Sequence, residues 1–319
     1  MKTISVGGCA LGAAILAFTF SPVVAGPVVA VDPPPVETEC PLDGARRPIT
    51  NPTLFDLPLA RTQLRPIVIF HRLPSQIDTV LGDVPVGGEV MVYALQFEYA
   101  FTDTWSLIAT KDGYIDINAD HTLSNRSGWA NLAAGVKWNF HREENTAAAL
   151  SLVYEAPTGN RSVFQGEGDG TLIPAMSGLW MHGRFQFNDT LGFRLPLDTS
   201  AESTFLFASA HMDYAVTERF FPMIELSWFH VLSTGDGGRR FDNQVGGMVP
   251  AVARFEGGDV FNLGAANASD NRNLVTLGAG FRYRATDNLD LGLAYEFPLN
   301  SDSKGLIRDR VTLDAVWRF

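Results

Sequence analysis

The sequence predicts an all-β fold, a transmembrane, up-and-down antiparallel β-barrel of about twelve strands. The first observation is that residues 308–319 alternate apolar and polar side chains with a period of two and end on Phe319, with no turn residue after it. Such a strand has different solvents on its two faces, and an apolar edge of this kind would aggregate in a soluble sheet. The second is that five interior segments repeat this ending. The third is that no segment after residue 30 approaches the roughly 20 apolar residues that a membrane helix needs, whereas barrel strands carry apolar residues at alternate positions.

In the repeated ending, an aromatic residue stands two positions before an apolar residue, and a short polar turn follows. Amphipathic rings are favoured at a membrane–water interface. We therefore expect all six segments to reach the same interface and to form an aromatic girdle there, with short turns after the first five. The six aromatic residues are Tyr99, Trp138, Phe185, Tyr214, Tyr283 and Trp317.

Taken in order, the alternation predicts strands that run alternately away from this interface and toward it. Segment 61–72 is included because single-chain barrels have even strand numbers and an ascending strand must precede 89–101. The alternation in 104–116 breaks at Lys111-Asp112-Gly113, which predicts a bulge or the membrane edge. The Gly-rich segments 157–174 and 233–271 are expected to be external loops. The predicted strands are 61–72, 89–101, 104–116, 129–140, 147–156, 178–187, 191–197, 204–216, 220–232, 274–285, 289–299 and 308–319.

The region before the barrel divides into two segments. Lys2, an apolar run over 10–20 and small residues at 23–25 are typical of a secretory signal peptide, which is predicted to cover residues 1–25. Residues 26–60 are rich in Pro, a composition that favours extended chain and not a packed core. This second segment is either a periplasmic lead-in or a partial plug that narrows the barrel mouth. The barrel is expected over 61–319.

Composition excludes several partners and sites. The net charge of -11 and the pI near 5.0 argue against a nucleic-acid partner. No Cys/His cluster has zinc spacing, and the Gly- and Asp-rich positions of the long loop lack the regular spacing of a calcium loop, so we expect no metal and no cofactor. Cys40 is the one cysteine of the predicted mature chain and cannot form an internal disulfide. A disulfide between chains or metal binding is its minor alternative.

Charged side chains fall on the inward face of the predicted strands, at membrane depth, where they are tolerated only if paired or in water. Two interpretations overlap: ion pairs that fill a narrow lumen, or a polar channel whose charges set solute preference. A strand number near twelve leaves the lumen width open. The residues expected to line the lumen are Glu98, Lys137, Glu155, His182, Arg184, Arg194, His211, Asp213, Glu225, Arg282, Arg284, Asp290, Glu296 and Asp314, together with Arg310 and Arg318.

A hydrolase is the competing class, because Ser209, His211 and Asp213 all face inward on one predicted strand. Catalysis would require hydrogen bonds from nucleophile to base to orienting group. Residues two apart on one strand are separated by roughly 6.5–7 Å, too far for direct bonding by short side chains. The order Ser-x-His also differs from the His-x-Ser of the outer-membrane phospholipase family. We therefore expect no enzymatic activity and no catalytic residue.

The pattern over residues 61–319 resembles the bacterial outer-membrane β-barrel class. In that class the C-terminal strand typically ends in Phe, which the assembly machinery reads, and Phe319 fits this feature. More loosely, the pattern is similar to barrels linked to solute transport and aromatic-compound degradation. The resemblance implies an outer-membrane location, lipid around the wall, assembly through the last strand, and passive or facilitated passage of small solutes. A non-conducting surface or structural anchor with a charge-filled lumen is the alternative.

Overall fold

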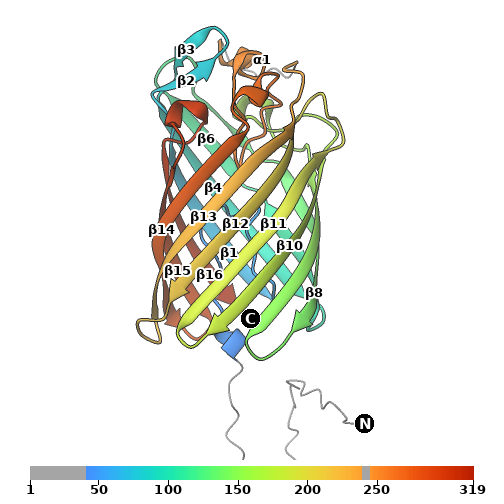
Figure 1. Cartoon of the computed structure of the whole chain (residues 1–319), viewed down its shortest axis with the longest axis vertical. Coiled ribbons are helices and arrows are strands. Elements are labelled where there is room, and N and C mark those ends of the chain that lie inside the picture. The colour runs from blue at the N-terminus through green and yellow to red at the C-terminus, as the bar shows by residue number, and fades with distance from the viewer. Residues whose placement is uncertain (1–40, 239–244) are drawn as a thin grey trace, which may run out of the picture.

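A single antiparallel sheet closes on itself in the computed structural model, which describes residues 41–238 and 245–319. The closure is made by the first strand, which pairs with both the last strand and the next wall strand (Figure 1). The sheet contains 14 strands, of which two pairs are halves of interrupted wall strands, so the wall has twelve. In chain order these are β1 (Gln63–Arg72), β4 (Gly88–Ala100), β5 (Trp105–Lys111) continued by β6 (Tyr114–Ala119), β7 (Arg126–Trp129) continued by β8 (Leu132–Arg142), β9 (Thr146–Ala156), β10 (Thr171–His182), β11 (Phe185–Pro196), β12 (Thr204–Tyr214), β13 (Phe220–Ser233), β14 (Asn273–Thr286), β15 (Leu289–Pro298) and β16 (Asp309–Arg318). The predicted fold class is confirmed.

The predicted break in the alternation at Lys111-Asp112-Gly113 separates β5 from β6, although both halves pair with β4. Gly113 has a φ of +113°, a backbone conformation that residues with a side chain rarely adopt. A Cβ at this position would lie 2.3 Å from the carbonyl oxygen of Tyr93. The carboxylate of Asp112 accepts a hydrogen bond from the backbone N–H of Leu95 at 2.8 Å. The break therefore adds a bend to the wall without leaving that amide unpaired.

The hairpin between β10 and β11 lies at Gly183-Arg184, so the predicted strands 178–187 and 191–197 were placed wrongly. Asn188-Asp189-Thr190 was interpreted as a polar turn, but it lies inside β11. Asn188 and Thr190 face inward and are buried, and Asp189 faces outward between Gly178 and Ala210 of the neighbouring strands. The real turn uses Gly183, whose φ of +58° suits a tight connection.

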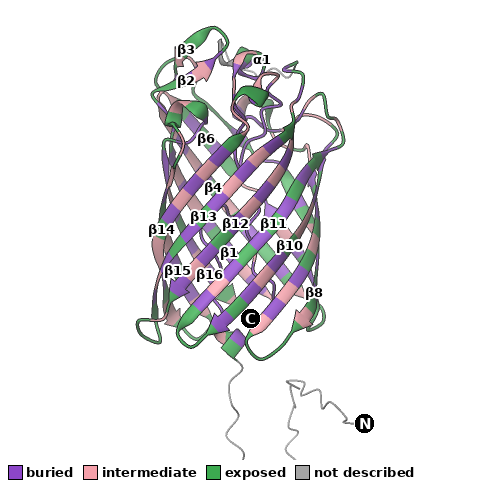
Figure 2. Ribbon diagram, in the orientation of Figure 1, coloured by how far each residue is buried: buried purple, intermediate pink, exposed green. Residues whose placement is uncertain are grey.

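Burial alternates along the wall strands, as the bands of Figure 2 show. The outward positions form a broad band of exposed apolar and aromatic side chains, including Leu95, Leu152 and Leu313, each more than two-fifths exposed. A band of this kind on the outside of a closed barrel is typical of membrane barrels, because only closed barrels satisfy their backbone groups in lipid.

The lower end of the barrel carries the short turns, and the C-terminus lies there (Figure 1). The upper end carries a small hairpin of β2 (Gln76–Thr79) and β3 (Gly82–Pro85), the helix α1 (Val249–Val252) and most of the 3-10 turns. None of the helical segments in the described part of the chain qualifies by length and hydropathy as a membrane-spanning helix. The 3-10 turns are η1 (Pro41–Gly44), η2 (Arg161–Val163), η3 (Val245–Met248), η4 (Ala268–Asp270) and η5 (Asp302–Lys304).

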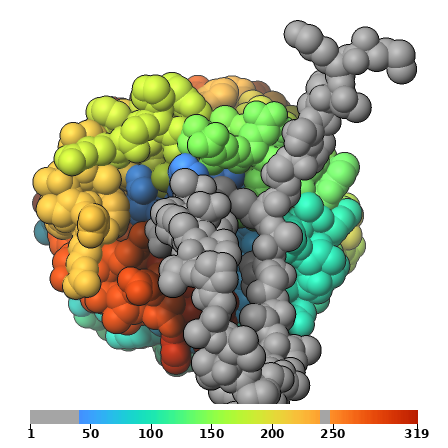
Figure 3. All heavy atoms as spheres, turned by 90° about the horizontal axis from the view of Figure 1, so that it is seen from below, coloured from blue at the N-terminus to red at the C-terminus, as the bar shows by residue number. Residues whose placement is uncertain are grey.

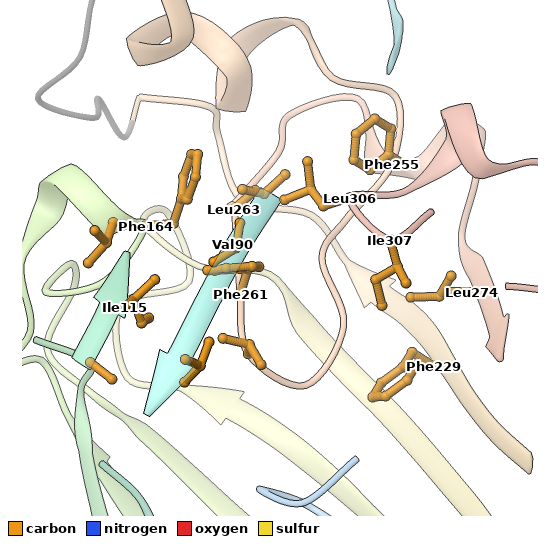
Figure 4. Packing of buried hydrophobic residues seen from close by; sticks show 14 of the residues in the cluster. Val90, Ile115, Phe164, Phe229, Phe255, Phe261, Leu263, Leu274, Leu306 and Ile307 are labelled. Atoms are coloured by element: carbon orange, nitrogen blue, oxygen red, sulfur yellow. The ribbon is translucent and has the colours of Figure 1, made fainter. Parts of the chain in front are cut away.

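Much of the inside of the upper barrel is apolar. The sequence predicted a polar cavity along the whole barrel, so this part of the prediction is wrong. Wall side chains from many strands point inward there and join one buried cluster with apolar side chains of the long loop, among them Phe255 and Phe261 (Figure 4). The wall members include Ile67, Ile69, Val90, Val92, Ile108, Ile115, Ile117, Val153, Ile173, Phe205, Phe207, Phe229, Val231 and Leu274.

Candidate functional site: the lumen and the two segments that fill it

The lower lumen is occupied by the chain that precedes β1. Residues 45–60 are almost entirely buried, and atoms of this N-terminal segment are seen in the mouth of the barrel from below (Figure 3). We call residues 41–60 the N-terminal plug. Apolar side chains of the plug pack against the wall in two small clusters, and polar wall side chains bind its backbone. The carbonyl oxygens of Arg47, Pro48, Pro52 and Pro58 accept hydrogen bonds from Arg282, Arg65, Gln96 and Asn139 of the wall, respectively.

Glu225 on β13 binds the middle of the plug. Its carboxylate accepts the backbone N–H of Ile49 at 2.9 Å and that of Thr50 at 2.6 Å, and also the Thr50 hydroxyl at 2.5 Å. His211 on β12 lies 2.7 Å from the same carboxylate and 2.9 Å from Asp213. Asp213 in turn accepts two hydrogen bonds from Arg46 of the plug. Three buried wall residues thus form one network that binds both the backbone of the plug and the guanidinium group of Arg46.

A second network joins the plug to β4 and β8 through Asp56. Lys137 donates to Asp56 at 2.9 Å and pairs with Glu98 at 2.8 Å. Arg47 of the plug pairs with Asp56 at 2.9 Å and approaches Glu98 at 3.7 Å. Burial raises the pKa of Asp56, but the opposing effect of Lys137 and Arg47 is larger in sum and brings that pKa from its ordinary 3.8 to about 2.

We expect acid to weaken plug binding through Asp56. A carboxyl whose pKa is lowered on docking stabilises the docked plug above the undocked pKa of 3.8, and this contribution is lost as the pH falls toward 2. The shift corresponds to roughly 2 kcal/mol. Limited proteolysis of the plug in detergent-solubilised protein should accelerate between pH 4 and 2 when an acid-active protease is used. Asp56→Asn should be cleaved at an elevated rate at pH 5 already; equal rates for the variant and the parent at pH 5 would contradict the assignment.

A triad of side chains from β1, β14 and β16 forms two buried ion pairs. Asp314 accepts Arg65 Nε at 2.6 Å and Arg282 Nη1 and Nη2 at 3.0 and 3.1 Å. Both guanidinium groups also donate to backbone carbonyls of the plug. The triad therefore ties three wall strands together and presents its remaining donors to the plug.

The long loop between β13 and β14 enters the lumen from the other end. Its tip, residues 255–263, is buried and is stabilised by Glu256, which accepts the backbone N–H groups of Gly257, Leu263 and Ala265. Burial raises the pKa of Glu256. The tip also meets the plug, because Thr53 donates its hydroxyl to the carbonyl oxygen of Asp259 at 3.2 Å. The two segments together occupy the lumen from both mouths.

Little space is left between these segments and the wall. Two cavities lined jointly by wall and plug residues measure about 20 Å³ each, and one beneath the loop measures about 10 Å³. Such volumes hold about one water molecule each. Larger hollows lie at the two ends, one of about 580 Å³ beside Arg184 and one of about 440 Å³ at the upper rim beside Arg72. The plug and the loop tip therefore fill most of the lumen of the described chain.

Most residues expected to line the lumen do point inward and are buried. Three of their groups are described above, and three more are added here. The groups are Glu98 with Lys137, the network of His211, Asp213 and Glu225, Arg282 with Asp314, Glu155 with Arg194, the pair Glu296–Arg310, and Asp290 with Arg284 and Arg318 at the lower mouth. His182 and Arg184 were placed wrongly. Both are exposed at the β10–β11 hairpin, because the turn lies there, and His182 stacks on the outward Trp180.

The six aromatic residues of the expected girdle all lie on the outside and are between 37% and 49% exposed. The strand registers bring neighbours together: Phe185 is opposite Tyr214, Trp138 is opposite Trp105, and Trp317 is opposite Leu64. Each is within a few residues of a lower turn or of the C-terminus. Phe185, however, begins an ascending strand and does not end a descending one.

Several residues that organise the lumen were missed by sequence reasoning. Arg65 could have been found, because it shares the inward parity of Gln63 and Ile67 on β1. Lys111 lies in the broken alternation, and its ammonium binds Glu155 at 2.5 Å. The partners supplied by the plug and the loop had no signal of this kind, because these segments are irregular and have no fixed parity.

The hydrolase arrangement does not form. The hydroxyl of Ser209 is bonded to Ser227 and to Asn51 of the plug, while both ring nitrogens of His211 are bonded to carboxylates. Within the described residues, no group of three or more His, Cys, Asp or Glu side chains is arranged to hold a metal ion. Cys40 and the predicted signal peptide lie outside the described residues.

The sequence matches no protein-family model and no curated relative. Solved structures resemble the fold. An outer-membrane channel from Pseudomonas putida F1 has a TM-score of 0.55 and 14% identity, covering 82% of this chain and 96% of that chain. The NanC porin has a TM-score of 0.48 and 7% identity, with coverages of 81% and 100%. The KdgM porin has a TM-score of 0.43 and 10% identity, with coverages of 80% and 99%. The first similarity shows a shared barrel fold.

Proposed function

We propose that this protein is a bacterial outer-membrane channel for small solutes, and that the N-terminal plug and the long loop close it in the conformation described. The observation that carries the proposal is that the lumen is filled by two segments that are not part of the wall. The plug continues into the wall at the start of β1. It is held by polar contacts, many of them to its backbone, and by small apolar clusters in which its Leu and Ile side chains pack against wall residues. Water can replace the polar contacts when a segment withdraws.

The likeness to a solved outer-membrane channel supports the proposal at the level of fold. The outer apolar band supports a membrane location, and the aromatic Phe319 directly after β16 would be the residue that the assembly machinery recognises. The internal charges would set the preference of the open lumen, as charged rings do in other pores. No enzymatic role is proposed.

A variant whose mature chain lacks both residues 41–60 and the loop tip 255–263 tests the proposal. Because these two segments fill the lumen, their removal should raise single-channel conductance in planar bilayers by at least about tenfold, as a twelve-stranded wall encloses space for water once it is emptied. A variant that lacks only residues 26–40 retains the plug and should behave as the parent does.

The competing function is a non-conducting anchor, in which the plug and the loop tip never leave the lumen. It predicts no conductance steps from either the parent or the variant that lacks both segments, provided that both show the heat-dependent gel shift of a folded barrel. That outcome would end the channel proposal.

A further inference from the structure

Three cations of the wall converge at the level where the loop tip enters the lumen. Lys111 on β5, Arg194 on β11 and Arg310 on β16 are all at most 5% exposed. The wall supplies two direct carboxylate partners: Glu155 binds both Lys111 and Arg194, and Glu296 lies 3.2 Å from Arg310. A further buried carboxylate, Glu202 in the connection between β11 and β12, accepts a hydrogen bond from the hydroxyl of Thr171.

The loop supplies a further carboxylate and two carbonyl oxygens to these three cations. Asp259 presents both carboxylate oxygens to Arg310 Nη1, at 2.9 and 3.1 Å. Its own carbonyl oxygen accepts from Arg194 at 3.2 Å, and the next carbonyl, of Val260, accepts from Lys111 at 3.1 Å. Arg194 Nε is buried and makes no hydrogen bond within the described residues, whereas Arg310 Nε lies against Glu296. The cation group therefore retains one donor beyond those that the wall and the loop use.

Phe261, two residues after Asp259, contributes an aromatic ring to the apolar cluster of the upper barrel. The ring of Phe261 meets Phe164 edge-on at 5.5 Å and His71 at 6.3 Å. Figure 4 shows Phe261 next to Val90 and Leu263 in the apolar cluster of the upper barrel. The segment Asp259-Val260-Phe261 thus brings one carboxylate to the cations and one phenyl ring to the apolar cluster of the upper barrel. The cations belong to the wall, and the surroundings of the ring are shared by the wall and the loop between β9 and β10.

We infer that the upper lumen contains a binding site for small aryl-alkyl carboxylates, and that the loop tip occupies this site as a built-in mimic of the ligand. The inference deepens the proposed function, since it requires that solutes reach the lumen. Arg310 would hold the carboxylate of the solute in place of Asp259, with Arg194 and Lys111 adding positive potential, and the apolar wall would take the ring in place of Phe261. An arriving solute would compete with the loop for the same contacts, so that binding and loop withdrawal are linked.

Calorimetric titration of the full-length, detergent-solubilised protein with 3-phenylpropionate tests the inference. Asp259→Asn keeps the shape of the side chain but removes the competing charge. The variant should bind 3-phenylpropionate about tenfold more tightly than the parent, since the exchanged contact is a charge-assisted pair. The neutral analogue 3-phenylpropanol and the ring-free propionate should each bind at least about tenfold more weakly than 3-phenylpropionate to this variant.

Asp270→Asn is the matched control, because Asp270 is an exposed acid of the same loop, and it should leave the affinity unchanged. Adding Arg310→Gln to Asp259→Asn should abolish the gain. The inference is overturned if Asp259→Asn, with its barrel folded, binds 3-phenylpropionate no better than the parent, or if 3-phenylpropanol gains equally. Binding and conductance are measured separately. Conductance without affinity for 3-phenylpropionate would refute the binding site alone. Absence of conductance in the test given under Proposed function would refute the channel.

Discussion

A disulfide between the plug and the wall is expected to abolish channel opening until it is reduced. A Cβ built on Gly278 of β14 would lie 3.6 Å from the Cβ of Thr50, within the range of about 3.5–4.5 Å found for disulfides. It would also lie 2.6 Å from the Thr50 methyl group, which the substitution Thr50→Cys removes. The pair Thr50→Cys and Gly278→Cys therefore suits a cross-link in the closed conformation.

The measurement is single-channel conductance of the double variant in a Cys40→Ser background, before and after a thiol reductant. The oxidised protein should show openings at least about tenfold rarer or smaller than the reduced protein, because a closed plug leaves cavities of only about one water in size. Thr50→Cys alone should not respond to the reductant. Equal conductance in both states, with the disulfide verified by mass, would show that solutes pass without plug movement.

The largest loss of stability is expected at Asp314. This carboxylate is the shared partner of Arg65 and Arg282, and both guanidinium groups are about 1% exposed. Asp314→Asn would leave two buried cations with one neutral amide between them, and breaking a buried pair in this way costs about 3–5 kcal/mol. Urea unfolding of the barrel in lipid vesicles, followed by tryptophan fluorescence, would measure this change in the free energy of unfolding.

Asp287→Asn is the matched control, since Asp287 is exposed in the turn between β14 and β15 and should change stability by less than about 0.5 kcal/mol. Arg282→Gln in the Asp314→Asn background should restore part of the loss, because one of the two unpaired cations is then removed. Additive losses in the double variant would mean that Arg282 and Asp314 do not act as a pair.

The sequence allowed the wall to be predicted because a barrel strand is a local pattern: each inward residue is two positions from the next, and lipid requires the other face to be apolar. The same rule placed Lys137, Arg282 and Asp314 on the inward face before their partners were known. It failed at β11 because Asn188 and Thr190 are polar for a tertiary reason. Both donate to the carbonyl oxygen of Asp56 in the plug, and their polarity was interpreted as a turn.

The apolar lining of the upper lumen could not be predicted from the two-residue alternation either. Ile67, Ile69 and Val92 face inward although apolar, because the tip of the long loop covers them with apolar side chains of its own. A strand that is apolar on both faces carries no local sign of which face meets lipid and which meets a folded loop.

By itself the sequence determined the number of wall strands, the lipid-facing side of those strands that alternate apolar and polar residues, and the end of the molecule that carries the aromatic girdle. These follow from a repeat of two residues and from the two solvents that it separates. Only the tertiary structure decided whether the barrel is filled. The plug and the loop are irregular, and their partners lie far away in sequence, as Asp56 and Lys137 or Asp259 and Arg310 illustrate. Closure of the lumen depends on these long-range polar contacts, which no local repeat encodes.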